Sequence, residues 1–134
     1  MKLLVEVLVT APIESVWRAY TSPAEITHWN FASDDWHCPS ASVDLRVGGK
    51  FSSRMEAKDG SFGFDFAGEY TAIEPNRLIE YRFGDRTAEI RFAEKADGVV
   101  VSVSFDPEAD NPADMQQSGW QSILDNFADY VTSI

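Results

Sequence analysis

General acid–base chemistry needs a buried titratable group beside a substrate, and a few charged side chains of this sequence are candidates for it. Glu80 and Arg82 alternate with the apolar residues of their segment, so they belong to the solvent face of a strand. Asp44 and Arg46 share a face, which favours a structural salt bridge at a sheet edge. The sequence has no Ser/His/Asp ordering, nucleophile elbow or phosphate loop, so we expect no catalytic residues. The candidates are His28, Arg46, Asp65, Glu69, Glu80 and Arg82.

A metal site is the second kind of chemistry to consider, because two histidines and a cysteine occur in the first third of the chain. His37 and Cys38 are adjacent, and His28 precedes them. Adjacent ligands do not have the spacing of structural zinc sites, and the sequence contains no second cysteine. We therefore expect neither a metal site nor another cofactor. Cys38 is interpreted as a small apolar residue rather than a reactive thiol.

Aromatic side chains are unusually numerous, with four Trp, nine Phe and four Tyr. One hypothesis is a ligand cavity, since binding pockets are mostly apolar with a few polar groups. The alternative is an ordinary core that the rings fill at the usual packing density. The sequence leaves both open. The candidate cavity residues are Trp29, Trp36, Phe51, Met55, Phe64, Phe66, Tyr81, Phe83, Trp120, Leu124 and Phe127.

The element that would form one wall of such a cavity is at the C-terminal end. Apolar residues recur there at spacings of three and four, which predicts an amphipathic helix over residues 111–134. Asn111 is predicted to cap it, with Pro112 at the first position. Gly119 would cost about 1 kcal/mol in the helix interior, which indicates close backbone contact or a tolerated cost. At about 1.5 Å per residue the helix is roughly 30 Å long, and its large partner must be a sheet.

Most of the remaining sequence predicts strands joined by tight turns. Strands are expected over residues 3–9, 43–47, 51–57, 62–72, 79–83, 88–92 and 99–105. The turn signals are Asp59-Gly60, Pro75-Asn76, Gly84-Asp85 and Asp97-Gly98. Gly68 indicates a bulge or a close backbone approach. Residues 30–42 have no sustained period and are predicted to form a loop that folds over an opening.

Two short helices are predicted between the first strand and that loop. Pro12 opens the first helix, and Ser22 and Glu25 form a capping box that opens the second, which continues to Trp29. Short connections make sequential strands antiparallel neighbours. We therefore predict an α+β helix-grip fold, in which a curved antiparallel sheet of about seven strands wraps around one long C-terminal helix. Residues 1–134 are expected to form a single domain.

Composition and charge exclude several classes of protein. A hydrophobic content of 44% excludes disorder, and a net charge of −11 repels nucleic acid and anionic membranes. Glu6 interrupts the first apolar run, and no run of about 18 apolar residues exists, so we expect neither a signal peptide nor a membrane span. The lone Cys38 excludes an internal disulfide and predicts a cytoplasmic protein.

Short motifs spread over the whole chain resemble one family. They are Ala11-Pro12, Val16-Trp17, Asp35-Trp36, the run from Asp44 to Gly49 with Phe51, Gly68-Glu69-Tyr70, Gln116-Gln117, Gly119-Trp120 and Asn126-Phe127. In these motifs the sequence resembles the bacterial branch related to the C-terminal domain of the activator of the heat-shock ATPase chaperone. That family is part of the START and birch-pollen-allergen superfamily, also called SRPBCC.

The resemblance implies the same helix-grip fold, with a hydrophobic cavity between the long helix and the sheet. Lipids, sterols, polyketides and other apolar molecules are the ligands that the superfamily implies. We expect non-enzymatic binding of a hydrophobic small molecule or lipid first, and a co-chaperone that binds and stimulates a heat-shock ATPase second. A cyclase-like or hydrolase-like enzyme is a distant third, because one fold serves many functions. The eukaryotic activators have an additional N-terminal domain, which we expect this chain to lack.

Overall fold

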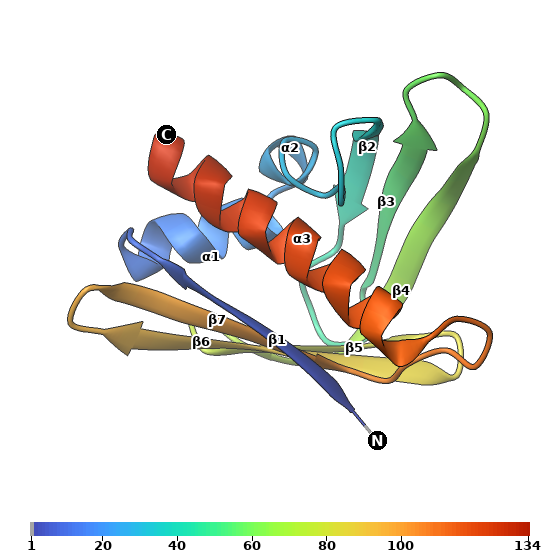
Figure 1. The fold of residues 1–134 in the computed structure, drawn as a ribbon. Helices are drawn as coiled ribbons and strands as arrows, with labels where there is room; N and C mark the ends of the chain where they lie inside the picture. Colours follow the sequence, from blue (N-terminus) through green and yellow to red (C-terminus); the bar gives the residue numbers. More distant parts are fainter. Residues whose placement is uncertain (1) are drawn as a thin grey trace.

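The computed structural model describes residues 2–134, in which a curved antiparallel sheet wraps around one long helix (Figure 1). The elements in chain order are β1 (Leu3–Val9), α1 (Ile13–Thr21), α2 (Pro23–Ile26), β2 (Trp36–Val43), β3 (Lys50–Ala57), β4 (Gly63–Glu74), β5 (Leu78–Phe83), β6 (Arg86–Lys95), β7 (Gly98–Phe105) and α3 (Ala113–Ser133). The predicted helix-grip fold, with two short helices after the first strand, is confirmed.

The sheet has seven strands in the order β1-β7-β6-β5-β4-β3-β2, and every neighbouring pair is antiparallel. Each strand from β2 to β6 is therefore hydrogen-bonded to the next strand in sequence, as the short connections predicted. The chain turns at all four predicted turn signals. Gly84 shows why residue type matters there: its φ of +65° is in the left-handed region, which glycine adopts without penalty.

The core lies where α1 and the C-terminal half of α3 pack on the sheet. Val9, Val16, Ile90, Phe105 and Phe127 are completely buried. Burying a large apolar side chain contributes about 1.5 to 3 kcal/mol relative to leaving it exposed, so these contacts anchor both helices. On α3 the buried residues are Leu124, Phe127, Ala128 and Val131.

Helix α3 lies along β1, the edge strand of the sheet (Figure 1). Gln117 donates a hydrogen bond of 2.8 Å to the Leu4 carbonyl, and Gln121 donates one of 2.9 Å to the Glu6 carbonyl. Antiparallel pairing uses alternate backbone groups of an edge strand, so these two carbonyls are the groups that β7 leaves unpaired. Two glutamines of α3 thus protect the exposed edge of the sheet.

The largest difference from the predicted elements is at β2. Residues 36–42 were predicted as part of a loop, and 43–47 as a strand, but β2 covers Trp36–Val43 and residues 44–49 connect it to β3. The register shifts between His37 and Ser40, where Pro39 lies. A bulged edge strand tolerates proline and has no strict alternation, so its apolar pattern is weak.

The helix starts also differ from the predictions. Helix α3 begins at Ala113 with Pro112 as its N-cap and without a side-chain cap, because the Asn111 amide contacts Glu108 instead. Ser22 precedes α2 but makes no side-chain cap either, and α2 ends at Ile26 rather than at Trp29. None of the helices in residues 2–134 combines the length and the apolar character needed to cross a membrane.

Gly68 and Gly119 differ in the space around the position that a Cβ would occupy. A Cβ on Gly68 would lie 2.6 Å from the Arg82 carbonyl and 2.8 Å from the Phe51 ring, so the predicted close approach is confirmed. A Cβ on Gly119 would meet no atom within 4 Å, so close contact does not explain this residue. The low helix propensity of Gly119 is thus tolerated without a packing reason in the helix interior.

We expect Gly119→Ala to raise the free energy of unfolding by about 0.5 to 1 kcal/mol, because alanine restricts the unfolded chain and suits a helix. Urea unfolding followed by circular dichroism measures it. Gly84→Ala is the matched control: it also has free space for a Cβ, but its positive φ should make it destabilising by about 1 kcal/mol. Loss of stability in Gly119→Ala would contradict the observed free space.

Candidate functional site

A cavity of about 760 Å³ lies between α3 and the concave face of the sheet. Its walls come from α1, the end of α2, strands β3 to β5 and the N-terminal half of α3. Pockets for small molecules have volumes of about 300 to 1,000 Å³, so this space is of the right size for an organic ligand. The aromatic rings therefore do not fill the whole interior.

Nine of the eleven residues predicted for the cavity line it. They are Trp29, Phe51, Met55, Phe64, Phe66, Tyr81, Phe83, Trp120 and Leu124. The rings contact one another in tilted and edge-to-face pairs, such as Phe51 and Tyr81, whose centroids are 4.7 Å apart. Trp120 reaches from α3 and stacks on Phe105 at 3.9 Å. These aromatic contacts hold the walls in place around the open space.

Phe127 and Trp36 are not among the lining residues. Phe127 is completely buried in the core, where its ring contacts Tyr20 and Trp29. Trp36 packs against Phe62 and Phe64 at the far end of the β3–β4 hairpin. Helical and strand periodicity identifies the apolar face, but it does not tell how far along that face a cavity extends.

The polar lining residues were not predicted. Tyr20, Ser53 and Tyr70 lie inside, and Asp85, Arg86 and Glu108 carry charges on the lining. The tyrosines occupy apolar positions of α1 and β4 and so resemble ordinary core residues in the sequence. Asp85 lies in the β5–β6 turn, Arg86 begins β6 and Glu108 precedes α3, so these residues come from segments that are distant in sequence and give no common signal.

Burial determines the ionisation of the three tyrosines in the cavity. Burial, together with the nearby Asp44, raises the pKa of Tyr70 to about 12. Burial also raises the pKa of Tyr81 and of Tyr20 well above the ordinary tyrosine value, and neighbouring tyrosines add to both shifts. All three hydroxyl groups are therefore protonated at neutral pH and able to donate hydrogen bonds.

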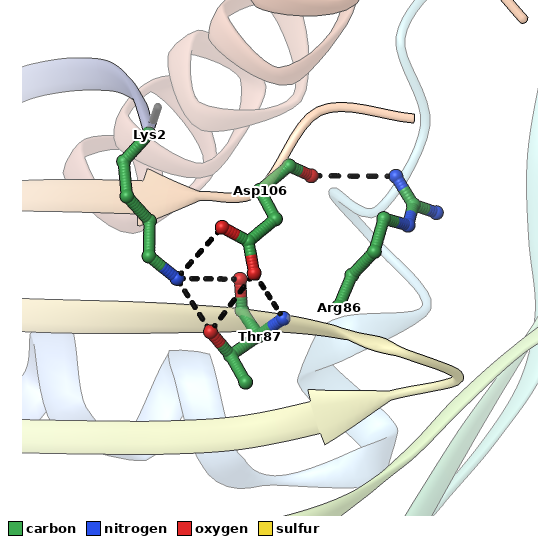
Figure 2. Close-up of polar contacts among 4 residues, drawn as sticks. All are labelled: Lys2, Arg86, Thr87 and Asp106. Atoms are coloured by element: carbon green, nitrogen blue, oxygen red, sulfur yellow. Dashed lines mark hydrogen bonds and ion pairs between the residues drawn. The ribbon is translucent and has the colours of Figure 1, made fainter. Parts of the chain in front are cut away.

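Arg86 belongs to a set of polar contacts next to the cavity (Figure 2). Its guanidinium lies 4.4 Å from the Phe83 ring centroid, and Nη1 donates to the Asp106 carbonyl at 3.5 Å. The Asp106 carboxylate accepts hydrogen bonds from the Thr87 amide at 2.9 Å and the Thr87 hydroxyl at 3.1 Å, and pairs with Lys2 at 3.2 Å. These contacts connect Lys2 before β1 with the start of β6 and the segment after β7.

The hydrogen bond from the Thr87 amide is the main cause of a lowered pKa of Asp106, and Lys2 adds to it. Because this pKa is lower in the folded than in the unfolded protein, the carboxylate stabilises the fold at neutral pH, and that stability is lost as pH falls below about 3.9. We expect Asp106→Asn to be less stable than wild type at about pH 7, with a smaller difference at about pH 3.

Urea unfolding at the two pH values measures this difference. Asp129→Asn is the matched control, since Asp129 is exposed on α3 and its carboxylate makes no ion pair in residues 2–134. An Asp106→Asn difference that stays constant with pH would show that the carboxylate charge does not stabilise this junction.

The candidates for acid–base or metal chemistry make ordinary structural contacts, and among them only Asp65 lines the cavity. Asp65 pairs with Arg54 at 3.5 Å, Glu69 with Arg82 at 3.6 Å, and Arg46 with Asp44 at 2.9 Å as predicted. Glu80 accepts a hydrogen bond from Thr71, and His28 stacks on Tyr130. Within residues 2–134 no three His, Cys, Asp or Glu side chains are placed to hold a metal ion.

Cys38 is buried, as its interpretation as a small apolar residue requires. Its thiol donates to the Ser40 carbonyl at 3.4 Å. Burial raises the pKa of the thiol, which favours the unreactive protonated form.

The curved sheet, the long α3 and the cavity between them define a helix-grip protein of the SRPBCC type. The chain belongs to the family described as Activator of Hsp90 ATPase homolog 1-like protein, whose model matches residues 10–132. The family suggested by the sequence motifs is therefore confirmed.

Solved structures agree with this assignment. An AHSA1-like protein from Aeromonas hydrophila is 43% identical with a TM-score of 0.94, covering 99% of this chain and 93% of that one. A protein from Cytophaga hutchinsonii is 48% identical with a TM-score of 0.84, covering 98% and 92%. A protein from Nitrosomonas europaea, 18% identical with a TM-score of 0.85 over 99% and 95%, shares the fold. Among curated proteins, none is significantly similar.

Proposed function

We propose that this protein binds a hydrophobic small molecule or lipid in the cavity between α3 and the sheet, without catalysing a reaction on it. The observation that carries the proposal is the cavity of about 760 Å³, whose walls are mostly aromatic and aliphatic side chains. An empty apolar space of this size forfeits dispersion contacts that an apolar ligand would restore. Only four of the lining side chains are charged, namely Asp65, Asp85, Arg86 and Glu108, and small-molecule pockets typically have few polar groups.

The positions of the charged side chains in the cavity lining favour a ligand with an uncharged, apolar part. The acidic lining residues Asp65 and Asp85 are exposed, and no ionisable carboxylate of the lining is fully buried. An apolar group that contacts the aromatic part of the lining would therefore bury no fully enclosed carboxylate, so the gain from burying apolar surface is retained.

A co-chaperone is the second candidate, and the observation that favours it is the family description, which refers to activators of the Hsp90 ATPase. Such an activity would use the outer surface rather than the cavity. The two functions are distinguished by which residues respond to which partner.

An amide-shift NMR titration of the labelled protein tests the proposal, with myristic acid, cholesterol and naringenin as probes, followed by a purified Hsp90-type ATPase. We expect shifts at lining residues such as Phe51, Tyr81 and Trp120 with at least one of the small molecules. If no small molecule shifts the amide signals of the lining residues, and the ATPase broadens the signals of outward-facing residues, the co-chaperone function would replace the cavity function.

A cavity-filling variant gives a second test. Ile123 is half-buried on α3 and lines the cavity, so Ile123→Trp places the added ring in the open space. We expect the affinity for the best of these probes to fall at least about tenfold, with the free energy of unfolding within about 1.5 kcal/mol of wild type.

The matched control is Ile134→Trp. Ile134 is the C-cap of the same helix and is 63% exposed, so this change should leave the affinity unchanged. Equal affinities of the Ile123 and Ile134 variants would show that the probe does not occupy the cavity.

A further inference from the structure

Three tyrosine hydroxyl groups in the cavity have no hydrogen-bond partner among residues 2–134. Tyr70 and Tyr81 are only 6% and 8% exposed, and Tyr20 is half-buried, yet all three line the cavity. No fully enclosed side-chain nitrogen or oxygen lacks a partner in this part of the chain. The three hydroxyls are therefore not fully enclosed by protein atoms, and the residues that carry them line the cavity. Tyr130 is different, because its hydroxyl donates to the Glu25 carboxylate at 3.3 Å outside the cavity.

Two of the three side chains, Tyr70 and Tyr81, lie side by side in the cavity. Tyr70 on β4 and Tyr81 on β5 are directly opposite in the strand register, so their side chains lie side by side on one face. Both rings contact Phe51, with centroids 5.2 Å and 4.7 Å apart. Tyr20 lines the same cavity from α1, where its ring packs on Trp29 and Phe127.

We propose that Tyr70 and Tyr81 form a hydrogen-bond donor site for an oxygen atom inside an otherwise apolar ligand, such as a ketone carbonyl. This inference rests on the proposed function and specifies its ligand class: oxygenated apolar molecules rather than plain hydrocarbons. A buried hydroxyl without a partner costs free energy, so a ligand that supplies an acceptor gains more than one that leaves the hydroxyls unpaired.

The chemistry of the surroundings selects an acceptor rather than a charged group. Arg86 is the cationic side chain of the lining, and it lies over the Phe83 ring. The carboxylates of Asp65, Asp85 and Glu108 also line the cavity and would repel an anion. Neutral tyrosine hydroxyls are donors of moderate strength, which suit a carbonyl or ether oxygen.

Two probes that differ in a single group test this inference. Benzophenone and diphenylmethane have the same two rings, joined by a carbonyl in the first and by a methylene in the second. Affinities are measured by NMR titration for the wild type, Tyr70→Phe, Tyr81→Phe, the double variant and the control Tyr130→Phe.

We expect the wild type to bind benzophenone about three- to tenfold more tightly than diphenylmethane, the effect of one or two hydrogen bonds. Each single variant should reduce this ratio, and the double variant should bring it close to one without loss of affinity for diphenylmethane. Tyr130→Phe should keep the wild-type ratio.

Urea unfolding separates ligand recognition from a structural role. Because the hydroxyls have no protein partner, Tyr70→Phe and Tyr81→Phe should be as stable as wild type. A ratio of one in the wild type, or a ratio that survives in the double variant, would overturn the donor site and leave the cavity function in place. Failure of both probes to shift any lining residue would overturn the donor site and count against the cavity function as well.

Discussion

The attachment of α3 along the edge strand β1 is the constraint on which the rest of the structure depends. Gln117 and Gln121 bind the backbone of β1, and Trp120 between them stacks on Phe105 of β7. The helix is thereby fixed at one side of a curved sheet, and the middle strands bend away from it. A curved sheet and a straight helix cannot be in contact everywhere, so the space between them is a consequence of the fold.

The buried polar groups of the cavity, such as the Tyr70 and Tyr81 hydroxyls, are uncharged, whereas the carboxylates of Asp65 and Asp85 are exposed to solvent. Tyrosine suits this interior because it combines an aromatic ring, which packs against Phe51 and its neighbours, with a hydroxyl that stays protonated when buried. A carboxylate in the same position would have to lose its hydration, which costs several kcal/mol. Recognition inside such a site therefore relies on hydrogen bonds of neutral groups.

The sequence predicted the fold well, because strong alternation and turn residues determine strands that have one buried face. It failed at β2, where a bulge around Pro39 at the sheet edge removes the alternation. Most of the apolar cavity wall was predictable for the same reason. Tyr20 and Tyr70 were not, since helical or strand periodicity assigns a tyrosine to the core without showing that its side chain lines an open space. That property depends on the distance between two elements, which periodicity does not encode.

The glutamines that bind Leu4 and Glu6 also have a consequence for association between molecules. An exposed strand edge is a template on which another chain can add a strand, and α3 covers this one. A motion that lifts α3 from the sheet would therefore open the cavity and uncover the edge at the same time. We expect a filled cavity, by keeping α3 in place, to protect this protein against aggregation as well as against unfolding.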